Sequence, residues 1–513
     1  MSKFLLSLLF ASIAFAACAA GTEQPRDPFG LTGPDIVILS DVATAVGSNR
    51  MGEYLQTMAL LGRTKTGPTY QQLSPKARYI IDVLYGQAAY GLNQFDTAHD
   101  AYLHATEYEA ASESDWFYRF ETAVYANNYR DANVAFTTLR NRWRDFADHL
   151  DATLVYRFER GLLTIPKSED AQLAFETHLY ERGWLDRKED RLANAIRFHY
   201  AQHLIDKGDT ARAARAIDDV TDPHALAVMH ADKRFDTLLA SNPEKFDVAS
   251  ALNAEWAATS SIPPRTIFDV CGCDSHAAVL YQMGRFGETL NAIDAAFARV
   301  VSVSGEMRRE NQNFDTEYND ALTLRSLTLF ALGRRDEAVG VASALQQENC
   351  CGANTEMPML MGRLLIWMDR GKEASDYLMM VFENNLTPVE SADLASLHVC
   401  AATQTHGAPA QQYMLADLRK AMFEPGAVLR GYVCANDLDG AASAIVEGLA
   451  DPQIRPLMLD QLQIYQPDGV QTEAQKAFQA KFDRLRSRPD VLAAVAKVGR
   501  INHYPLVPQH WFY

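Results

Sequence analysis

Positive charge is scarce in this 513-residue sequence, which has 48 lysine and arginine residues against 65 aspartate and glutamate residues. The formal net charge of −17 argues against nucleic acid as a partner, because binding to a phosphate backbone needs clustered lysine and arginine. The same deficit argues against adsorption to anionic lipid. The simplest role for the acidic residues is to keep the protein soluble.

The sequence also lacks the short motifs of several large enzyme classes. It contains no His-Glu-x-x-His, no Gly-x-x-x-x-Gly-Lys-Ser/Thr, no Gly-x-Ser-x-Gly, and no Gly-x-Gly-x-x-Gly after a strand. Two carboxylates are enough for a glycoside hydrolase, so an envelope hydrolase stays open as a distant third interpretation. We predict a non-catalytic protein with no catalytic residues, no cofactor and no metal site.

Long apolar runs are confined to the N-terminus. Lys3 supplies a short basic region, residues 4–15 are mostly apolar, and Ala16 and Ala17 are small residues suited to cleavage. Residues 1–17 are therefore predicted to be a bacterial signal peptide. This run is too short for a stable membrane-spanning helix, and no later run is long enough either. We expect an exported protein.

Cys18 follows directly and resembles the lipidated cysteine of a bacterial lipobox, although Phe15 stands where that family prefers leucine. The resemblance implies a periplasmic lipoprotein that is anchored to an envelope membrane through Cys18. Ordinary signal cleavage, for instance after Ala19, is the alternative. Residues 18–33 contain two prolines and are predicted to be a flexible tether.

Helical patterns dominate the rest of the chain, and no stretch alternates polar and apolar residues for long enough to predict a sheet. Residues 34–73 are predicted to be an N-terminal helical segment, in which Tyr54 and Leu61 fall on one helical face. Ser74 and Pro75 then supply an N-cap and a proline in the first turn, which together mark the start of a helix.

An internal repeat begins at that point. Four pairs of residues are 34 positions apart: Gly86 and Phe120, Phe95 and Tyr129, Ala98 and Ala132, and Tyr102 and Phe136. This period, with an aromatic residue opening the second helix and an alanine and an aromatic residue four apart, resembles the tetratricopeptide (TPR) repeat, a helix–turn–helix unit. Phe120 departs from the small residue that the family has there. Because one helix pair cannot bury its apolar face, such pairs stack into a solenoid.

The resemblance implies an all-α fold, a right-handed solenoid of antiparallel helix pairs that extends over residues 74–450. Weaker copies place second-helix alanines at Ala213, Ala338, Ala374 and Ala441. Residues 451–513 change character and contain three amphipathic helical stretches. We expect these residues to form a C-terminal helical cap, since a repeat array has to cover its last apolar face.

The resemblance also implies a binding surface, because the concave groove of TPR proteins is lined by first-helix residues that face away from the second helix. Carried over by position, the groove residues here are Gln87, Tyr90, Phe117, Glu121, Tyr125, Phe198 and Gln202. Aromatic and amide side chains suit contacts with peptides or glycans. We therefore expect an envelope scaffold or assembly factor that binds a protein or peptide. The alternative is a carbohydrate- or peptidoglycan-binding envelope protein.

Cysteine is rare, and six residues remain besides Cys18: Cys271, Cys273, Cys350, Cys351, Cys400 and Cys434. An even number in an exported protein suggests disulfides. Cys400 and Cys434 are one repeat length apart, so we predict that they lie at equivalent points of neighbouring first helices and form a bridge. The other four are disulfide candidates in loops. A metal site that adds His276 is the less favoured alternative, because adjacent cysteines cannot easily give both sulfurs to one tetrahedral ion.

Overall fold

The structure is a computed structural model that describes residues 33–187, 191–260, 275–301, 314–348, 356–381, 386–405 and 415–508. It divides into two compact units, residues 1–149 and residues 150–513. The predicted array of residues 74–450 is therefore shared between the two units. The predicted signal peptide and nearly all of the tether lie outside the described residues, as do Cys18, Cys271, Cys273, Cys350 and Cys351.

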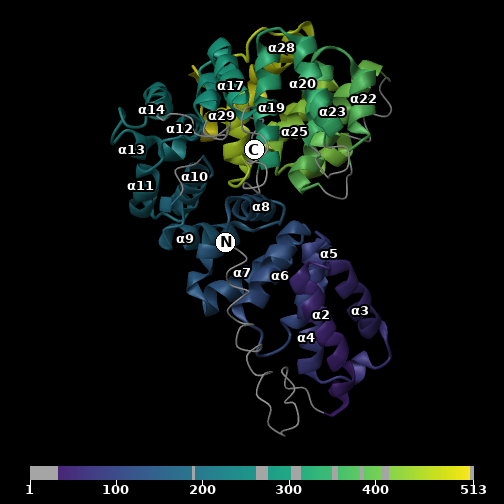
Figure 1. The fold of residues 1–513 in the computed structure, drawn as a ribbon. Coiled ribbons are helices and arrows are strands. Elements are labelled where there is room, and N and C mark those ends of the chain that lie inside the picture. The colour runs from purple at the N-terminus through teal and green to yellow at the C-terminus, as the bar shows by residue number, and fades with distance from the viewer. Residues whose placement is uncertain are drawn as a thin grey trace. The chain divides into compact units, whose positions relative to one another are not determined.

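Unit 1 consists of helices joined by short connections (Figure 1). Its elements are η2 Gly33–Ile38, α2 Leu39–Met51, α3 Tyr54–Thr66, η3 Tyr70–Gln72, α4 Pro75–Gly91, α5 Phe95–Ala105, α6 Glu113–Tyr125, α7 Tyr129–Arg142 and η4 Arg144–His149. The first four make up the helical segment that the sequence predicts for residues 34–73. The Ser74 side chain caps α4 by accepting a hydrogen bond from the Ala77 N–H, as the Ser-Pro pair indicates.

Unit 2 is also helical. Its helices are α8 Ala152–Leu162, α9 Glu169–Glu181, η5 Leu185–Arg187, α10 Arg191–Asp206, α11 Thr210–Asp218, α12 Pro223–Ala231, η6 Lys233–Phe235, α13 Asp236–Leu239, α14 Val248–Ser260, α16 His276–Gln282, α17 Phe286–Val301, α19 Phe314–Ala331, α20 Arg335–Glu348, α21 Glu356–Trp367, α22 Gly371–Leu378, α23 Pro388–Thr405, η8 Arg419–Ala421, α25 Pro425–Cys434, α26 Leu438–Ala450, α27 Arg455–Leu462, α28 Glu473–Arg486 and α29 Pro489–Val498. Two short strands, β1 Ile464–Tyr465 and β2 His503–Tyr504, pair in parallel.

The predicted all-α class is confirmed, since β1 and β2 are the only strands in the described part of the chain. The sequence did not indicate this two-residue pair. None of the helices that the structure describes is both long and apolar enough to cross a membrane.

Eight helix pairs within the described residues share one turn geometry. They are α2–α3, α4–α5, α6–α7, α10–α11, α16–α17, α19–α20, α21–α22 and α25–α26. One residue in each turn has a positive φ, between 56° and 82°: Gly52, Asn93, Asn127, Gly208, Gly284, Gly333, Asp369 and Asn436. The N–H of the next residue donates to a carbonyl five residues earlier, as Gln94 does to Ala89. This bond satisfies a carbonyl that the end of the first helix would otherwise leave free.

The fifth residue after each of these turn residues is fully buried, with an exposed fraction of 0%. These residues are Thr57, Ala98, Ala132, Ala213, Thr289, Ala338, Ala374 and Ala441. A small side chain at this position lets the second helix approach its neighbours closely. The register that the sequence predicts from Ala98 and Ala132 is therefore found in both units, with threonine replacing alanine at Thr57 and Thr289.

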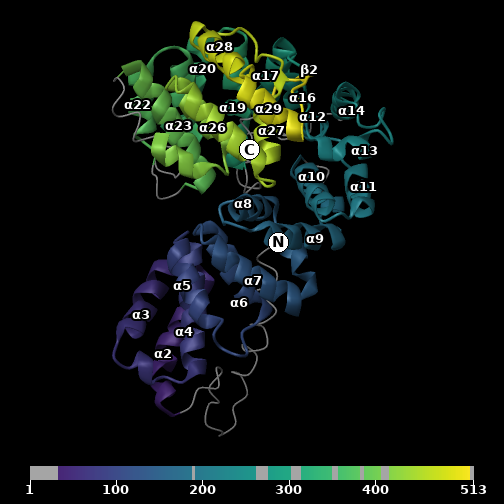
Figure 2. The ribbon, with the colours of Figure 1, turned by 180° about the vertical axis from the view of Figure 1, so that it is seen from behind.

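The C-terminal segment, residues 451–508, does more than cover the last helix pair (Figure 2). It packs α28 and α29 on α26, as expected of a cap. Three of its backbone N–H groups also donate to carbonyls much earlier in the chain: Val470 to Ala331, Arg500 to Ala231, and Val507 to Gln282, at 2.7, 2.9 and 2.7 Å. The acceptors are the last residues of α19, α12 and α16, whose final carbonyls have no partners within their own helices. We call this segment the C-terminal brace.

Two glycines allow the brace to approach these helix ends. A Cβ atom on Gly499 would lie 2.3 Å from the carbonyl oxygen of Ala231, and one on Gly469 would lie 2.2 Å from that of Ala331. Gly469 also has a φ of +87°, which residues with a side chain rarely adopt. The predicted cap is thus correct in its helices, while its return to the middle of unit 2 was not foreseen.

Replacing Ala132 with arginine would place a long charged side chain at a fully buried position of α7. We expect Ala132→Arg to lower the free energy of unfolding by at least about 3 kcal/mol, through overpacking and burial of an unpaired charge. Denaturant unfolding followed by circular dichroism measures the change. Val134→Arg is the control, because Val134 lies on the same helix and is 52% exposed. Equal stability of the two variants would contradict the repeat register.

Replacing Gly499 with alanine tests the brace. We expect Gly499→Ala to destabilise the protein by about 1–3 kcal/mol, because its methyl group would meet a backbone carbonyl that cannot move aside cheaply. Gly340→Ala is the matched control. Gly340 lies inside α20 with open space around it, so this change should stabilise the protein by about 0.5–1 kcal/mol. Melting temperatures that rise in both variants would refute the close approach.

Candidate functional site

Five of the seven predicted groove residues lie on α4 and α6, the first helices of successive pairs in unit 1. Gln87 and Tyr90 are three residues apart on α4. Phe117, Glu121 and Tyr125 follow each other at intervals of four on α6, so each set shares one side of its helix. Glu121 is buried and the other four are half-buried. We call these five residues the aromatic face.

A hydrogen bond connects the two helices at the aromatic face. Tyr90 Oη donates to Glu121 Oε1 at 2.8 Å. Burial, and then the charge of Glu121, raise the pKa of the Tyr90 hydroxyl well above its usual value, so the hydroxyl remains a donor. Near the start of both helices, Tyr79 Oη donates to Asp115 Oδ2 at 2.7 Å. These two bonds fix the register between α4 and α6, and with it the direction of the side chains between them.

Aromatic rings pack on one another beside this hydrogen bond. The Tyr90 ring makes edge contacts with Phe95 and Tyr118, with centroids 5.9 and 5.5 Å apart. Tyr125 stacks on Phe95 at 4.8 Å, and the Phe117 ring lies 6.4 Å from that of Tyr118. Half-buried rings held in this way offer a large contact area at a small cost in side-chain entropy.

The other two predicted groove residues lie on α10 of unit 2. Phe198 is buried and packs on Phe235, with ring centroids 5.5 Å apart. The prediction that Phe198 lines a groove is therefore wrong, because η6 covers this side of α10. Gln202, one turn later, instead lines a cavity.

This cavity has a volume of about 490 Å³ and lies within unit 2. Its walls come from α8, α9, α10 and the start of the C-terminal brace. Gln453 of the brace donates from Nε2 to Gln172 Oε1 of α9 at 2.9 Å. The brace therefore closes one side of the cavity by a direct contact with the helices opposite.

Acidic and imidazole groups from three helices meet in the cavity. Glu159 of α8, Glu176 of α9 and His199 of α10 each offer one atom that could bind a metal, and these atoms lie within 4.8 Å of one another. His199 Nδ1 and Glu159 Oε1 form a hydrogen bond of 2.6 Å. Burial acts to raise the pKa of the Glu159 carboxyl, but the charge and hydrogen bond of His199 outweigh it and lower that pKa.

Glu176 has a different environment, although it lies in the same cavity. Its exposed fraction is 2%, and burial, followed by the charge of Glu159, raises the pKa of its carboxyl well above the usual value. Burial also lowers the pKa of His203 to about 4. Both shifts favour the uncharged form of the group, so Glu176 and His203 do not form an ion pair.

This cluster is not apparent in the sequence. Its members come from three helices at separations that match no short metal-binding motif. One local signal was present: His199 and His203 are four residues apart, which places both imidazoles on one side of α10.

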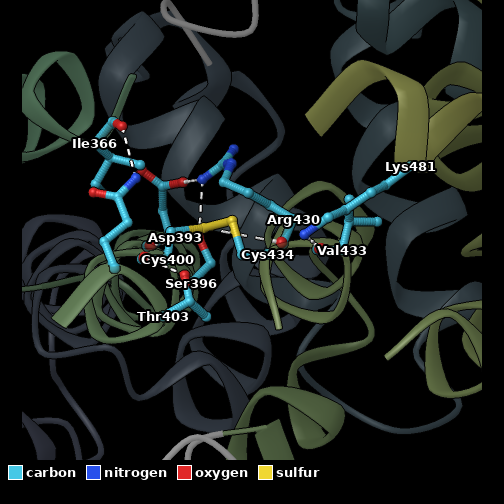
Figure 3. Close-up of a disulfide and its surroundings, with 10 residues drawn as sticks. Ile366, Asp393, Ser396, Cys400, Thr403, Arg430, Val433, Cys434 and Lys481 are labelled. Carbon is cyan, nitrogen blue, oxygen red and sulfur yellow. Dashed lines mark hydrogen bonds and ion pairs between the residues drawn. A yellow bond between two sulfur atoms is a disulfide. The ribbon is translucent and has the colours of Figure 1, made fainter. Parts of the chain in front are cut away.

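A disulfide joins Cys400 of α23 to Cys434 of α25, with Cα atoms 5.1 Å apart (Figure 3). This is the pair that the repeat spacing singles out. Beside it, the Asp393 carboxylate of α23 pairs with Arg430 of α25 and with Arg363 of α21. One covalent bond and one shared carboxylate thus connect α21, α23 and α25.

Comparisons with known proteins add little to this description. No family model matches the sequence, and no curated protein matches it. The solved structures that resemble it include yeast Tom70, with a TM-score of 0.33, 12% identity, and coverage of 91% of this chain and 100% of that chain. Another is Naa15/Naa10 bound to HypK-THB, with a TM-score of 0.23, 15% identity, and coverage of 92% and 77%. Both scores are too low to carry an argument, so the TPR-like fold rests on the repeated helix pairs.

Peptide mapping without reductant tests the bridge. We expect a linked peptide containing Cys400 and Cys434. Replacing both cysteines with alanine should lower the free energy of unfolding by up to about 3–4 kcal/mol, since the bridge closes a loop of 34 residues in the unfolded chain. Reductant should destabilise the parent protein more than the double variant, which no longer contains this bridge. If both thiols are alkylated in denaturant without reductant, the disulfide does not exist.

Proposed function

We propose that this protein is a non-catalytic scaffold that holds a protein or peptide segment on the aromatic face. The observation that carries the proposal is the arrangement of Gln87, Tyr90, Phe117 and Tyr125, which are half-buried on the first helices of two successive pairs. The Tyr90–Glu121 hydrogen bond holds that arrangement before any partner binds. A surface that is organised in advance loses little conformational entropy on binding.

The ring geometry favours a peptide over a sugar. The rings of Tyr90 and Tyr125 both contact the ring of Phe95, at interplanar angles of 72° and 24°, so the three rings do not form one flat platform. Aliphatic and basic side chains can pack between and against such rings. The Gln87 amide adds a donor and an acceptor for a peptide backbone. The net charge of −17 favours a partner segment that is neutral or basic.

The proposal includes a location in the bacterial envelope. The basic, apolar and small-residue regions of residues 1–17 support export, and Cys18 supports a lipid anchor. The Cys400–Cys434 bridge is of the kind found in oxidising compartments. An assembly factor of the envelope, which holds another protein while it is built into a complex, fits these features.

Site-specific photocrosslinking tests the binding face. A photoreactive phenylalanine analogue at Gln87 should give discrete protein adducts in intact envelopes, because Gln87 lies on the aromatic face. The same analogue at Val134, which is exposed on α7, should not. Tyr125→Ala in the Gln87-labelled chain should reduce the adduct severalfold, since it removes a ring that stacks on Phe95.

Two results would argue against the proposal. Adducts of equal yield from Gln87 and Val134 would mean that the aromatic face has no special role. Adducts that are released by a muramidase and not by a protease would indicate the carbohydrate-binding alternative. Circular dichroism of each variant checks that the helices remain folded.

A further inference from the structure

The cavity between α8, α9 and α10 holds three potential metal ligands from three different helices. The ligand atoms of Glu159, Glu176 and His199 lie within 4.8 Å of one another. Glu159 and Glu176 are buried, with exposed fractions of 6% and 2%. The hydrogen bond between His199 and Glu159 does not include Glu176, so a second carboxyl group lies buried beside that pair.

Two polar atoms in the same cavity lack partners among the described residues. Glu176 Oε2 accepts no hydrogen bond there, and His203 Nδ1 lies 3.9 Å away, which is too far for one. Gln202 Nε2 donates none, although Gln202 is only 4% exposed and lines the cavity. Buried polar groups are normally satisfied, so unpaired atoms at a cavity point to a ligand.

We propose that this cavity binds one divalent transition-metal ion through Glu159, Glu176 and His199. Carboxylate oxygen and imidazole nitrogen are the ligands that zinc and related ions take in proteins. Ligand atoms bound to zinc at about 2.0–2.2 Å lie roughly 3.4 Å apart in a tetrahedron, so side-chain shifts of about 1 Å would complete the site. The ion balances both carboxylates, and water in the cavity supplies the remaining position.

The cavity provides the surroundings that a metal site needs. Its volume of about 490 Å³ leaves access for the ion and for water. His203 lies one turn from His199 on α10, with its Nδ1 3.9 Å from Glu176 Oε2, so its imidazole borders the site without a hydrogen bond to that carboxyl. The site belongs to unit 2 and is independent of the aromatic face and of the function proposed for it.

Zinc titration of the purified full chain, after removal of metals with a chelator, tests the proposal. Isothermal titration calorimetry should show one tight zinc site per chain. Glu176→Gln and His199→Gln should each weaken it by at least about 100-fold, since each removes a ligand. Glu169→Gln is the matched control: it makes the same chemical change at an exposed residue of α9 that lines the same cavity, and should leave the affinity unchanged.

Cobalt substitution identifies the ligands without any variant, and so decides the question even if a variant fails to fold. An absorption spectrum of the cobalt-loaded protein that indicates nitrogen and oxygen ligands, and lacks the near-ultraviolet thiolate-to-cobalt band, would support the cavity site. A strong thiolate band would place the ion on cysteines and overturn the proposal. Absence of a tight site in the parent chain would overturn it, as would unchanged affinity in both Glu176→Gln and His199→Gln.

Discussion

The structure depends on the close approach of paired helices at one small side chain. In each of the eight helix pairs that share the left-handed turn, the second helix carries a fully buried alanine or threonine five residues after the turn residue. The turn fixes where the second helix begins, and the small side chain fixes how near it lies to its neighbours. Which side of each first helix remains uncovered follows from these two constraints. The aromatic face therefore depends on how the helix pairs pack as much as on its own side chains.

The repeat could be predicted from the sequence because its requirements are local. Asn93 and Ala98, or Asn127 and Ala132, are separated by five positions, and the same pattern returns after 34 residues. The role of Gly499 could not be predicted in this way. What excludes a side chain there is the carbonyl of Ala231, which is distant in the sequence. Hence the helices of the cap were foreseen, while its return to α12, α16 and α19 was not.

The two candidate sites differ in the same way, because one follows from spacing along a helix and the other depends on how helices pack. Register along α4 and α6 assigned Tyr90 and Glu121 to the lining of one groove, and in the structure a hydrogen bond joins the two residues. The same reasoning was wrong for Phe198, which is not open to a groove, because Phe235 of η6 packs against it on α10. It also could not reveal Glu159, Glu176 and His199 as a group, since their convergence depends on how three helices of unequal spacing pack. Local periodicity in the sequence predicts which side of a helix a residue lies on. It does not predict which residues of different helices come together.

The C-terminal brace has a consequence for how unit 2 is made. Residues 470, 500 and 507 leave the ribosome well after α19, α12 and α16, yet the ends of those helices depend on them for hydrogen bonds. Those helices must wait, with their last carbonyls exposed to water, until the brace has been synthesised. Contacts of such long sequence separation close late and slowly. The sequence of unit 1 is synthesised long before the brace, so its helices can pack on one another while the rest is still being translated.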